Sequence, residues 1–386
     1  MKNILCVYAT RQIDSNLFMS SSIFNGLQQC GYKVDMLFCG TKHTCYNFKS
    51  TYSQYFDNVY YQELSDSLLL NLCRKNSLTH VAYNFYRGFV MDRYFRPYNI
   101  SKIKGIIKDD YDLILSFVPI ALSAYLAYDV QKYIIPNVRI FQFWTDPLSL
   151  GQLDSIHDIP KSRLWHKYIE KSIIKLADKM VFCYPLFCHC MKELYPKYAD
   201  KMRWSDIAYM KHEKANIKPN NEKVMIGLFG AYQTNVRNIY PLLDTLKEFP
   251  NVQFIIRGDS DIIINTTDYP NLDVVQGRIP LMEVEDLEAN CDILLCLAGR
   301  SGITIPAGKV FYYGDYNKPI LYISDGKNKD YASDYMRSFG RYEICENTVE
   351  SIKIGIRNCI NALDGYNVSI PDRIEPATVA RKIIEE

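Results

Sequence analysis

The stretches NILCVYA, Asn3–Ala9, and KVDMLFC, Lys33–Cys39, are strand-length runs dominated by apolar residues. Such runs are typical of parallel strands that are covered on both faces. The segment between them begins with a polar loop and continues as LFMSSSIFNGLQQC. Its apolar residues recur at helical spacing until Gly31, a residue type that commonly ends helices. Strand, loop, helix and strand in this order predict the opening of a doubly wound α/β sheet.

The same alternation of strands and helices continues along most of the 386 residues. It is interrupted at Lys211–Lys223, where KHEKANIKPNNEK is polar and charged and contains a Pro-Asn-Asn turn, as linkers between domains often do. The strand VMIGLFG, Val224–Gly230, begins a second series after it. The sequence therefore predicts two successive Rossmann-like α/β domains, with the elements of Thr41–Tyr98 left ambiguous.

Composition excludes several classes of protein. A formal net charge of +2 argues against a dedicated nucleic-acid binder. The start MKNILCVYAT does not have the pattern of a signal peptide, and no apolar run is long enough to span a bilayer. We therefore expect a cytoplasmic protein. Its 12 cysteines are expected to be reduced thiols, and the cluster Cys188–Cys190 lacks the spacing of a zinc site, so no metal is predicted.

Four loops in the second series bring arginine or glycine to the ends of strands. Ligands of open α/β sheets bind beyond the carboxyl ends of the strands, where glycine lets the backbone approach a phosphate and arginine pairs with it. These loops predict a site for a phosphate-bearing ligand, and the alternative is that the arginines are solvated surface charges. The candidate residues are Gly230, Arg237, Arg257, Gly277, Arg278, Ile279, Ser301 and Gly302.

The segments FGAYQTNVRNIYPLL, CDILLCLAG and GKVFYYGDYNKPILYI, together with FQFWTDP and DLILSFVP, resemble bacterial GT-B-fold glycosyltransferases. In particular they resemble members of the glycosyltransferase group 1 superfamily that build lipopolysaccharide, capsule or other surface glycans. The resemblance covers nearly the full chain. It implies two Rossmann-like domains facing across a cleft: residues 1–212 bind the acceptor and residues 213–370 the nucleotide-sugar donor. It also implies that residues 371–386 form a helix that crosses back to the first domain.

The resemblance implies an enzyme that moves a sugar from a nucleotide-sugar to a glycan or lipid-linked acceptor, without cofactor or metal. Carried over by residue, Gly230 and Arg237 face the phosphates, and Gln276–Ile279 lie where the nucleobase is gripped. Lys309 and Tyr312 lie on the helix that faces the ribose and the diphosphate. Charge on the leaving diphosphate would then be stabilised by Arg237, Lys309 and backbone N–H groups.

One departure from the family pattern leaves alternatives open. Retaining members commonly carry two glutamates spaced E-x7-E, and Thr304 and Tyr312 occupy these positions here. Neither side chain can act as a carboxylate, although Tyr312 can still donate a hydrogen bond. The stereochemistry of the reaction is therefore open. A sugar-nucleotide epimerase of the same fold and a non-catalytic nucleotide-binding homologue are the alternative functions.

The first domain supplies the candidates for catalysis and acceptor binding. An inverting enzyme needs a general base, for which we select Asp14 and Asp146. Asp14 could instead cap the first helix, and Asp146 could shape a turn. Arg11 and Trp144 are the candidate acceptor-binding residues, with a place in the core as the alternative for Trp144. The segment Phe85–Lys108 interleaves aromatic and basic residues, which fits either peripheral contact with anionic lipid of the inner membrane or a solvated basic face.

Two D-x-D strings, Asp110–Asp112 and Asp259–Asp261, have the composition that holds a metal–diphosphate complex in other transferases. The first precedes its predicted strand and so lies at the wrong edge of the sheet. The second is followed by an apolar run. Neither is predicted to bind a metal.

Overall fold

The computed structural model describes the chain except residues 1, 12–14, 66–91, 93, 119–120, 147, 149–159, 218, 220, 235, 278, 300–305, 327 and 386. The described residues form two compact units. Unit 1 contains the described residues up to 148, those from Pro160 to Ile207, and those from Pro376 onward. Unit 2 contains the described residues from Ala208 to Glu375.

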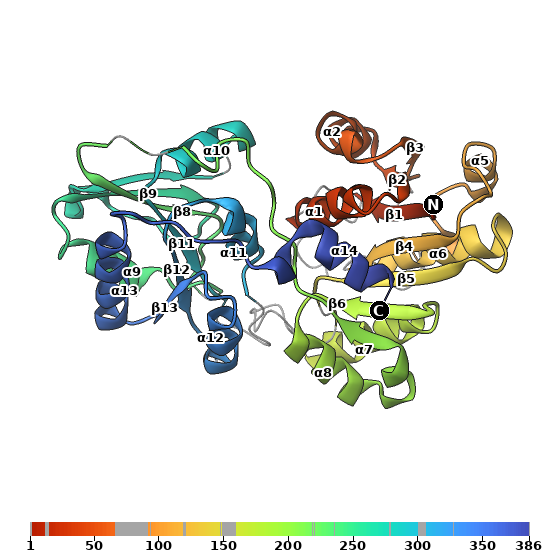
Figure 1. Ribbon diagram of the computed structural model, residues 1–386. Coiled ribbons are helices and arrows are strands. Elements are labelled where there is room, and N and C mark those ends of the chain that lie inside the picture. The colour runs from red at the N-terminus through yellow and green to blue at the C-terminus, as the bar shows by residue number, and fades with distance from the viewer. Residues whose placement is uncertain are drawn as a thin grey trace. The chain divides into compact units, whose positions relative to one another are not determined.

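Unit 1 is built on a parallel sheet of seven strands in the order β3-β2-β1-β4-β5-β6-β7 (Figure 1). The order reverses between β1 and β4, as it does in doubly wound folds. The strands are β1 (Asn3–Thr10), β2 (Lys33–Gly40), β3 (Asn58–Glu63), β4 (Leu113–Val118), β5 (Arg139–Trp144), β6 (Lys179–Phe182) and β7 (Met202–Trp204). The main helices are α1 (Ser15–Gln29), α2 (Lys42–Tyr52), α5 (Ile100–Lys104), α6 (Ala121–Tyr133), α7 (Pro160–Ile174), α8 (Pro185–Leu194) and α14 (Pro376–Ile384).

Unit 2 repeats this plan with a parallel sheet of six strands in the order β10-β9-β8-β11-β12-β13. Here the order reverses between β8 and β11. The strands are β8 (Val224–Phe229), β9 (Val252–Gly258), β10 (Leu272–Gln276), β11 (Ile293–Leu297), β12 (Ile320–Ser324) and β13 (Glu343–Glu346). The main helices are α9 (Tyr240–Leu246), α10 (Leu281–Asn290), α11 (Gly308–Tyr312), α12 (Lys329–Arg337) and α13 (Val349–Asn361).

A repeated aspartate sets the register at the amino edge of both sheets. In four places the aspartate directly before a strand accepts a hydrogen bond from a backbone N–H at the start of the neighbouring strand. The pairs are Asp57 with Val34, Asp112 with Asn3, Asp178 with Ile140, and Asp292 with Met225, each at 2.8 Å. Asp110 accepts from Asn3 Nδ2 at 3.2 Å, so both carboxylates of the Asp110–Asp112 string are used at this edge.

The helix at the end of the chain, α14, belongs to unit 1 and packs directly on α1. Gly26 makes this close approach feasible, because a Cβ at that position would lie 2.0 Å from Pro376 O. Cys30 Sγ donates to Ala377 O at 3.3 Å, and Tyr32 OH donates to Glu385 Oε1 at 2.5 Å. The last described helix, α14, is therefore part of the same unit as the first helix, α1.

Candidate functional site

Glycine loops line the carboxyl edge of the sheet in unit 2. Gly230, Gly277 and Gly326 follow β8, β10 and β12, with φ angles of +140°, +97° and +87°, and Gly258 is the last residue of β9, with a φ angle of +157°. L side chains rarely adopt such angles, so the sharp exits from these strands depend on glycine. Because β8 lies at the reversal of strand order, the loop at Gly230 occupies the position where open α/β sheets bind their ligands.

The first three of these loops are connected in a row. Gly230 N donates to Arg257 O at 2.9 Å, and Gly277 N donates to Gly258 O at 3.0 Å. A Cβ on Gly258 would lie 2.0 Å from Gly230 O, so the two backbones touch. By contrast, a Cβ on Gly230 or Gly277 would meet no atom within 4 Å among the described residues. The backbone at these two positions is therefore open to a ligand.

Arg237 lies in the loop after β8 and has an unused donor. Its Nη1 donates to Ala231 O at 3.0 Å, whereas its buried Nε has no hydrogen-bond partner in the described part of the chain. Burial lowers the pKa of the guanidinium, and Cys296 and Tyr322 act on this pKa in the opposite direction. A partly buried cation whose buried Nε–H has no partner among the described residues suits an anionic ligand group.

By contrast, the Arg257 side chain makes its hydrogen bonds within the sheet. Its Nη2 forms an ion pair with Asp273 Oδ2 at 2.6 Å, and its Nη1 donates to Ile256 O and Asp273 O at 3.0 Å each. Only 8% of the residue is exposed. These contacts join β9 to β10, which gives Arg257 a structural role whether or not a ligand is bound.

The polar side chains of α11 contact glutamates of α10. Lys309 Nζ is paired with Glu288 Oε1, and Tyr313 OH donates to the same oxygen at 3.0 Å. Tyr312 OH donates to Glu285 Oε1 at 3.4 Å. Burial raises the pKa of the Glu285 carboxyl, and the charge of Glu288 adds to this effect. Lys309 and Tyr312 thus hold α11 against α10, a contact that the sequence prediction of a donor-facing helix did not include.

The segment predicted as a linker is partly packed into unit 2. His212 and Ala215 are buried, and the backbone N–H of His212 donates to Asp315 Oδ2 at 2.7 Å. The imidazole Nε2 lies 2.9 Å from Tyr312 O, and the ring stacks on Tyr316 at a centroid distance of 4.7 Å. Burial lowers the pKa of His212 to about 4, so the imidazole is neutral at pH 7. Sequence reasoning missed this residue because its surroundings in the sequence are polar.

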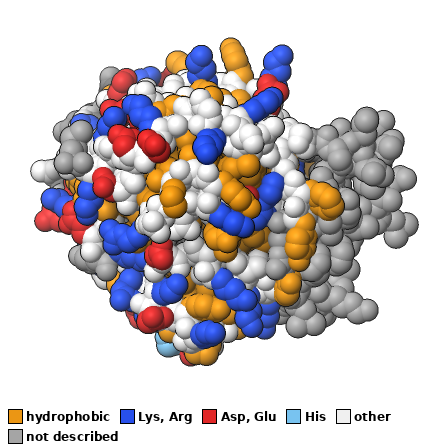
Figure 2. All heavy atoms as spheres, turned by 90° about the vertical axis from the view of Figure 1, so that its right-hand side faces the viewer, with side chains coloured by type: hydrophobic (Ala, Val, Ile, Leu, Met, Phe, Trp, Pro, Cys, Tyr) orange, Lys and Arg blue, Asp and Glu red, His pale blue; other side chains and the backbone are white. Residues whose placement is uncertain are grey.

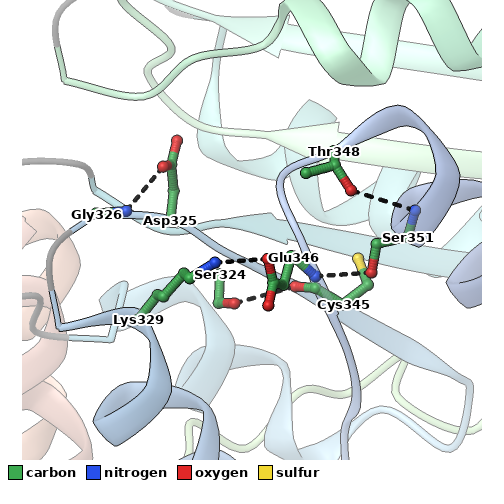
Figure 3. Close-up of polar contacts among 8 residues, drawn as sticks. All are labelled: Ser324, Asp325, Gly326, Lys329, Cys345, Glu346, Thr348 and Ser351. Carbon is green, nitrogen blue, oxygen red and sulfur yellow. Dashed lines mark hydrogen bonds and ion pairs between the residues drawn. The ribbon is translucent and has the colours of Figure 1, made fainter.

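At the same carboxyl edge of the sheet in unit 2, side chains also connect the ends of β12 and β13 (Figure 3). Ser324 Oγ donates to Cys345 O at 3.1 Å, and Lys329 Nζ contacts Glu346 Oε2 at 2.5 Å. Thr348 Oγ1 accepts from Ser351 N at 3.4 Å and so caps α13. The sequence prediction included no residue of these two loops, because their polar residues carry no recognisable pattern.

The candidates in unit 1 have mainly structural contacts. Trp144 is fully buried, and its Nε1 donates to Gln142 Oε1 at 3.1 Å, so it belongs to the core. Arg11 forms a two-point ion pair with Asp92, at 3.0 and 3.4 Å. Asp146, just after β5, is partly exposed; burial raises the pKa of the Cys183 thiol, and the charge of Asp146 adds to this effect.

The remaining predicted residues, Asp14, Arg278, Ser301, Gly302 and Thr304, lie outside the described residues. Ile279 is partly buried in the loop before α10. In the part of the chain that the structure describes, no group of three His, Cys, Asp or Glu side chains is placed to hold a metal ion.

Figure 2 shows the side of unit 1 that carries α5, where basic and hydrophobic side chains lie next to each other. In α5 and just after it, Lys102, Lys104 and Lys108 are exposed, and Ile106 is 42% exposed. These residues belong to the described part of the predicted basic and aromatic segment, which comprises Asp92 and residues 94–108; residues 85–91 and 93 lie outside the described chain. None of the helices whose residues are described is both long enough and apolar enough to cross a bilayer.

No family model matches the chain, and no curated protein matches it. Solved structures are similar in fold. The glycotransferase of kitacinnamycin has a TM-score of 0.55 at 10% identity, covering 99% of this chain and 97% of that chain. HepE from Anabaena, solved in complex with UDP and glucose, has a TM-score of 0.55 at 11% identity, covering 99% of this chain and 95% of that chain. A UDP-N-acetylglucosamine 2-epimerase has a TM-score of 0.52 at 11% identity, covering 100% of this chain and 95% of that chain.

These similarities and the two parallel α/β sheets show that the chain has the GT-B fold. The fold class predicted from the sequence is therefore confirmed. At these levels of identity the similarity concerns the fold, and the chemistry has to be argued from the chain's own residues.

Proposed function

We propose that the protein is a metal-independent glycosyltransferase that takes a sugar from a nucleotide-sugar donor bound at the carboxyl edge of unit 2. The observation that carries this proposal is the buried, unused Nε of Arg237 beside the open backbone of Gly230, at the reversal of strand order. A donor diphosphate supplies the anionic oxygens that such a group binds. The presence of UDP and glucose in the HepE structure supports this class of ligand.

The acceptor in this proposal is a glycan or lipid-linked saccharide of a bacterial surface polysaccharide such as lipopolysaccharide or capsule. The protein would act in the cytoplasm, with peripheral contact at the inner membrane through the basic and hydrophobic face around α5. No cofactor is needed. Asp146 and Asp14 are the proposed general bases if the reaction inverts the anomeric centre.

The test is a thermal-shift screen against UDP-, GDP-, CMP- and dTDP-sugars, because a ligand that binds the folded state raises Tm. We expect a shift with the sugars of one nucleotide. Arg237→Ala should weaken that binding about 10- to 100-fold, since hydrogen bonds to charged groups contribute about 1.5–3 kcal/mol. Arg337→Ala is the matched control, because Arg337 is an exposed side chain on α12 paired with Asp334 at 2.7 Å. Binding that survives Arg237→Ala would contradict the proposed site.

The similarity to a 2-epimerase supports a second candidate, the epimerisation of a sugar-nucleotide. Product analysis separates the candidates. A new glycosidic bond supports the transferase, an epimerised nucleotide-sugar supports the epimerase, and nucleotide binding without turnover supports a non-catalytic homologue.

A further inference from the structure

Asn347 joins three of the loops that leave the carboxyl edge of the second sheet. It directly follows β13, and its Nδ2 donates to Asn238 O, after β8, and to Asp325 Oδ2, after β12, each at 2.8 Å. Its backbone N–H donates to Ser324 O at 2.9 Å. Both acceptors are oxygens that can only accept, so these contacts also fix which end of the amide is nitrogen.

The two acceptors of this amide are themselves held in place. Asp325 Oδ1 accepts from the N–H of Gly326 at 2.7 Å, which turns the loop after β12 (Figure 3). Asn238 Oδ1 accepts from Tyr240 N at 3.3 Å, at the start of α9. Asn347 therefore connects two loops that each have a defined local turn, rather than two loose segments.

The residue before Asn238 is Arg237, the group on which the proposed donor site depends. Arg237 also donates within its own loop, from its backbone N–H to Gln233 O at 2.9 Å and from Nη1 to Ala231 O at 3.0 Å. These contacts set the conformation of the loop after β8. The hydrogen bond from Asn347 connects this loop to the end of β13, the last strand in the order of the sheet. Asn347 Oδ1 is buried and has no hydrogen-bond partner among the described residues, so the amide acts through its N–H groups.

We propose that Asn347 is a positioning residue that holds the Arg237 loop where its guanidinium binds a phosphate group of the donor. The inference rests on the proposed function for the identity of the ligand. The hydrogen bonds that carry it do not depend on that function. Asn347 itself touches no reacting group in this assignment and acts through Asn238 and Arg237.

Asn347→Asp is the sharpest test, because it keeps the shape of the side chain, removes both N–H donors and places a carboxylate beside Asp325. We expect the dissociation constant for the best-bound sugar of the four-nucleotide panel to rise at least about tenfold, as for the loss of hydrogen bonds to a charged group. Asn358→Asp is the matched control. Asn358 donates to Glu343 Oε1 at 2.8 Å on the surface of the same unit, so the same change occurs beside the same kind of group, and the constant should change less than about twofold.

Exchanging the two partners distinguishes positioning from general stability. When Asp325→Asn is added to Asn347→Asp, the amide at 325 can donate to the new carboxylate, and one of the two lost bonds returns. The bond to Asn238 O does not return, so nucleotide affinity should stay low while the free energy of urea unfolding recovers in part. Hydrogen exchange of residues 231–239 without ligand should be faster than in the unchanged protein in both Asn347→Asp and the exchanged pair, because neither variant has the bond to Asn238 O.

The outcomes separate this inference from the proposed function. If the unchanged protein binds a nucleotide-sugar and Asn347→Asp binds it equally well, the inference is overturned and the proposed function stands. If the unchanged protein binds no member of the panel, the proposed function fails. In that case the hydrogen-exchange rates of Asn347→Asp test the positioning inference alone. Faster hydrogen exchange at residues 231–239 supports it, and unchanged hydrogen exchange overturns it.

Discussion

At the scale of single residues, the pair Lys309 and Glu288 shows how a side chain with the features of a ligand contact can be structural. Glu288 is fully buried, and Lys309 is its cationic partner. Removing one partner of a buried pair leaves a charge without compensation, which costs about 3–5 kcal/mol, whereas replacing both can be nearly neutral. The side chain of Lys309 is 28% exposed, so water will reduce the cost.

We therefore expect Lys309→Met to lower the free energy of unfolding by about 2–3 kcal/mol, somewhat below that range because water reaches Lys309. The double variant Lys309→Met with Glu288→Leu should recover most of the loss, because no buried charge is left. Urea denaturation of the single and double variants measures both values. A single variant as stable as the unchanged protein would show that Lys309 is not needed as the partner of Glu288 and is available to a ligand.

At the scale of helices, the contact between α1 and α14 depends on the missing side chain of Gly26. Alanine would favour the helix by about 1 kcal/mol. However, its Cβ would lie 2.0 Å from Pro376 O and 3.1 Å from Ala380 Cβ, so α14 would have to move. We expect Gly26→Ala to destabilise unit 1 by about 1–3 kcal/mol, as overpacking does. Faster hydrogen exchange at Pro376–Ile384 would locate the effect in α14.

Gly105→Ala is the control for this prediction. Gly105 ends α5, and the nearest atom to a Cβ at that position, Lys102 O, lies 3.4 Å away, which is an ordinary contact. Alanine should therefore be tolerated there. Equal effects of the two substitutions would show that the close approach of α14 is not what Gly26 provides.

Helices and strands also differ in how far the sequence predicts them. The central strands of both sheets follow directly from apolar runs such as DILLCLA, because burial on both faces imposes the composition of each strand locally. The edge strands β3, β7 and β13 contain no such run. The contacts of α11 could not be predicted, since Glu288 lies 21 residues before Lys309 and meets it only once α10 and α11 pack. The same holds for Asn347 and Asn238, which are 109 residues apart.

At the scale of the whole molecule, the described part of the chain enters unit 2 after Ile207 and leaves it after Glu375. The two connections are bonded to each other inside unit 2: Tyr209 N donates to Ile374 O and Tyr209 OH donates to Glu375 Oε2, each at 3.0 Å. His212, three residues after Tyr209, contacts Tyr312 O of α11 and the ring of Tyr316. Composition predicts a linker here, and the contact of His212 with Tyr312, 100 residues away, shows that part of this segment packs into unit 2.

This buried histidine predicts how stability depends on pH. The pKa of His212 is about 4 in the folded protein, against about 6.5 when exposed, so the unfolded chain binds more protons between these values. The contribution of His212 to stability is therefore complete above about pH 6.5 and is lost as the pH falls toward 4. The total loss is on the order of 3 kcal/mol. His212→Gln can still donate to Tyr312 O and does not titrate, so its stability should fall less over this range.

The measurement is the free energy of urea unfolding between about pH 4 and 7.5, compared between the unchanged protein and His212→Gln, since carboxylates contribute equally to both. His189→Gln is the control, because the His189 side chain is 66% exposed. The difference between the unchanged protein and His212→Gln should change steadily as the pH falls, while His189→Gln should parallel the unchanged protein. Parallel curves for His212→Gln as well would mean that the connection does not bury a neutral imidazole against α11, and that the anchor of the chain in unit 2 lies elsewhere.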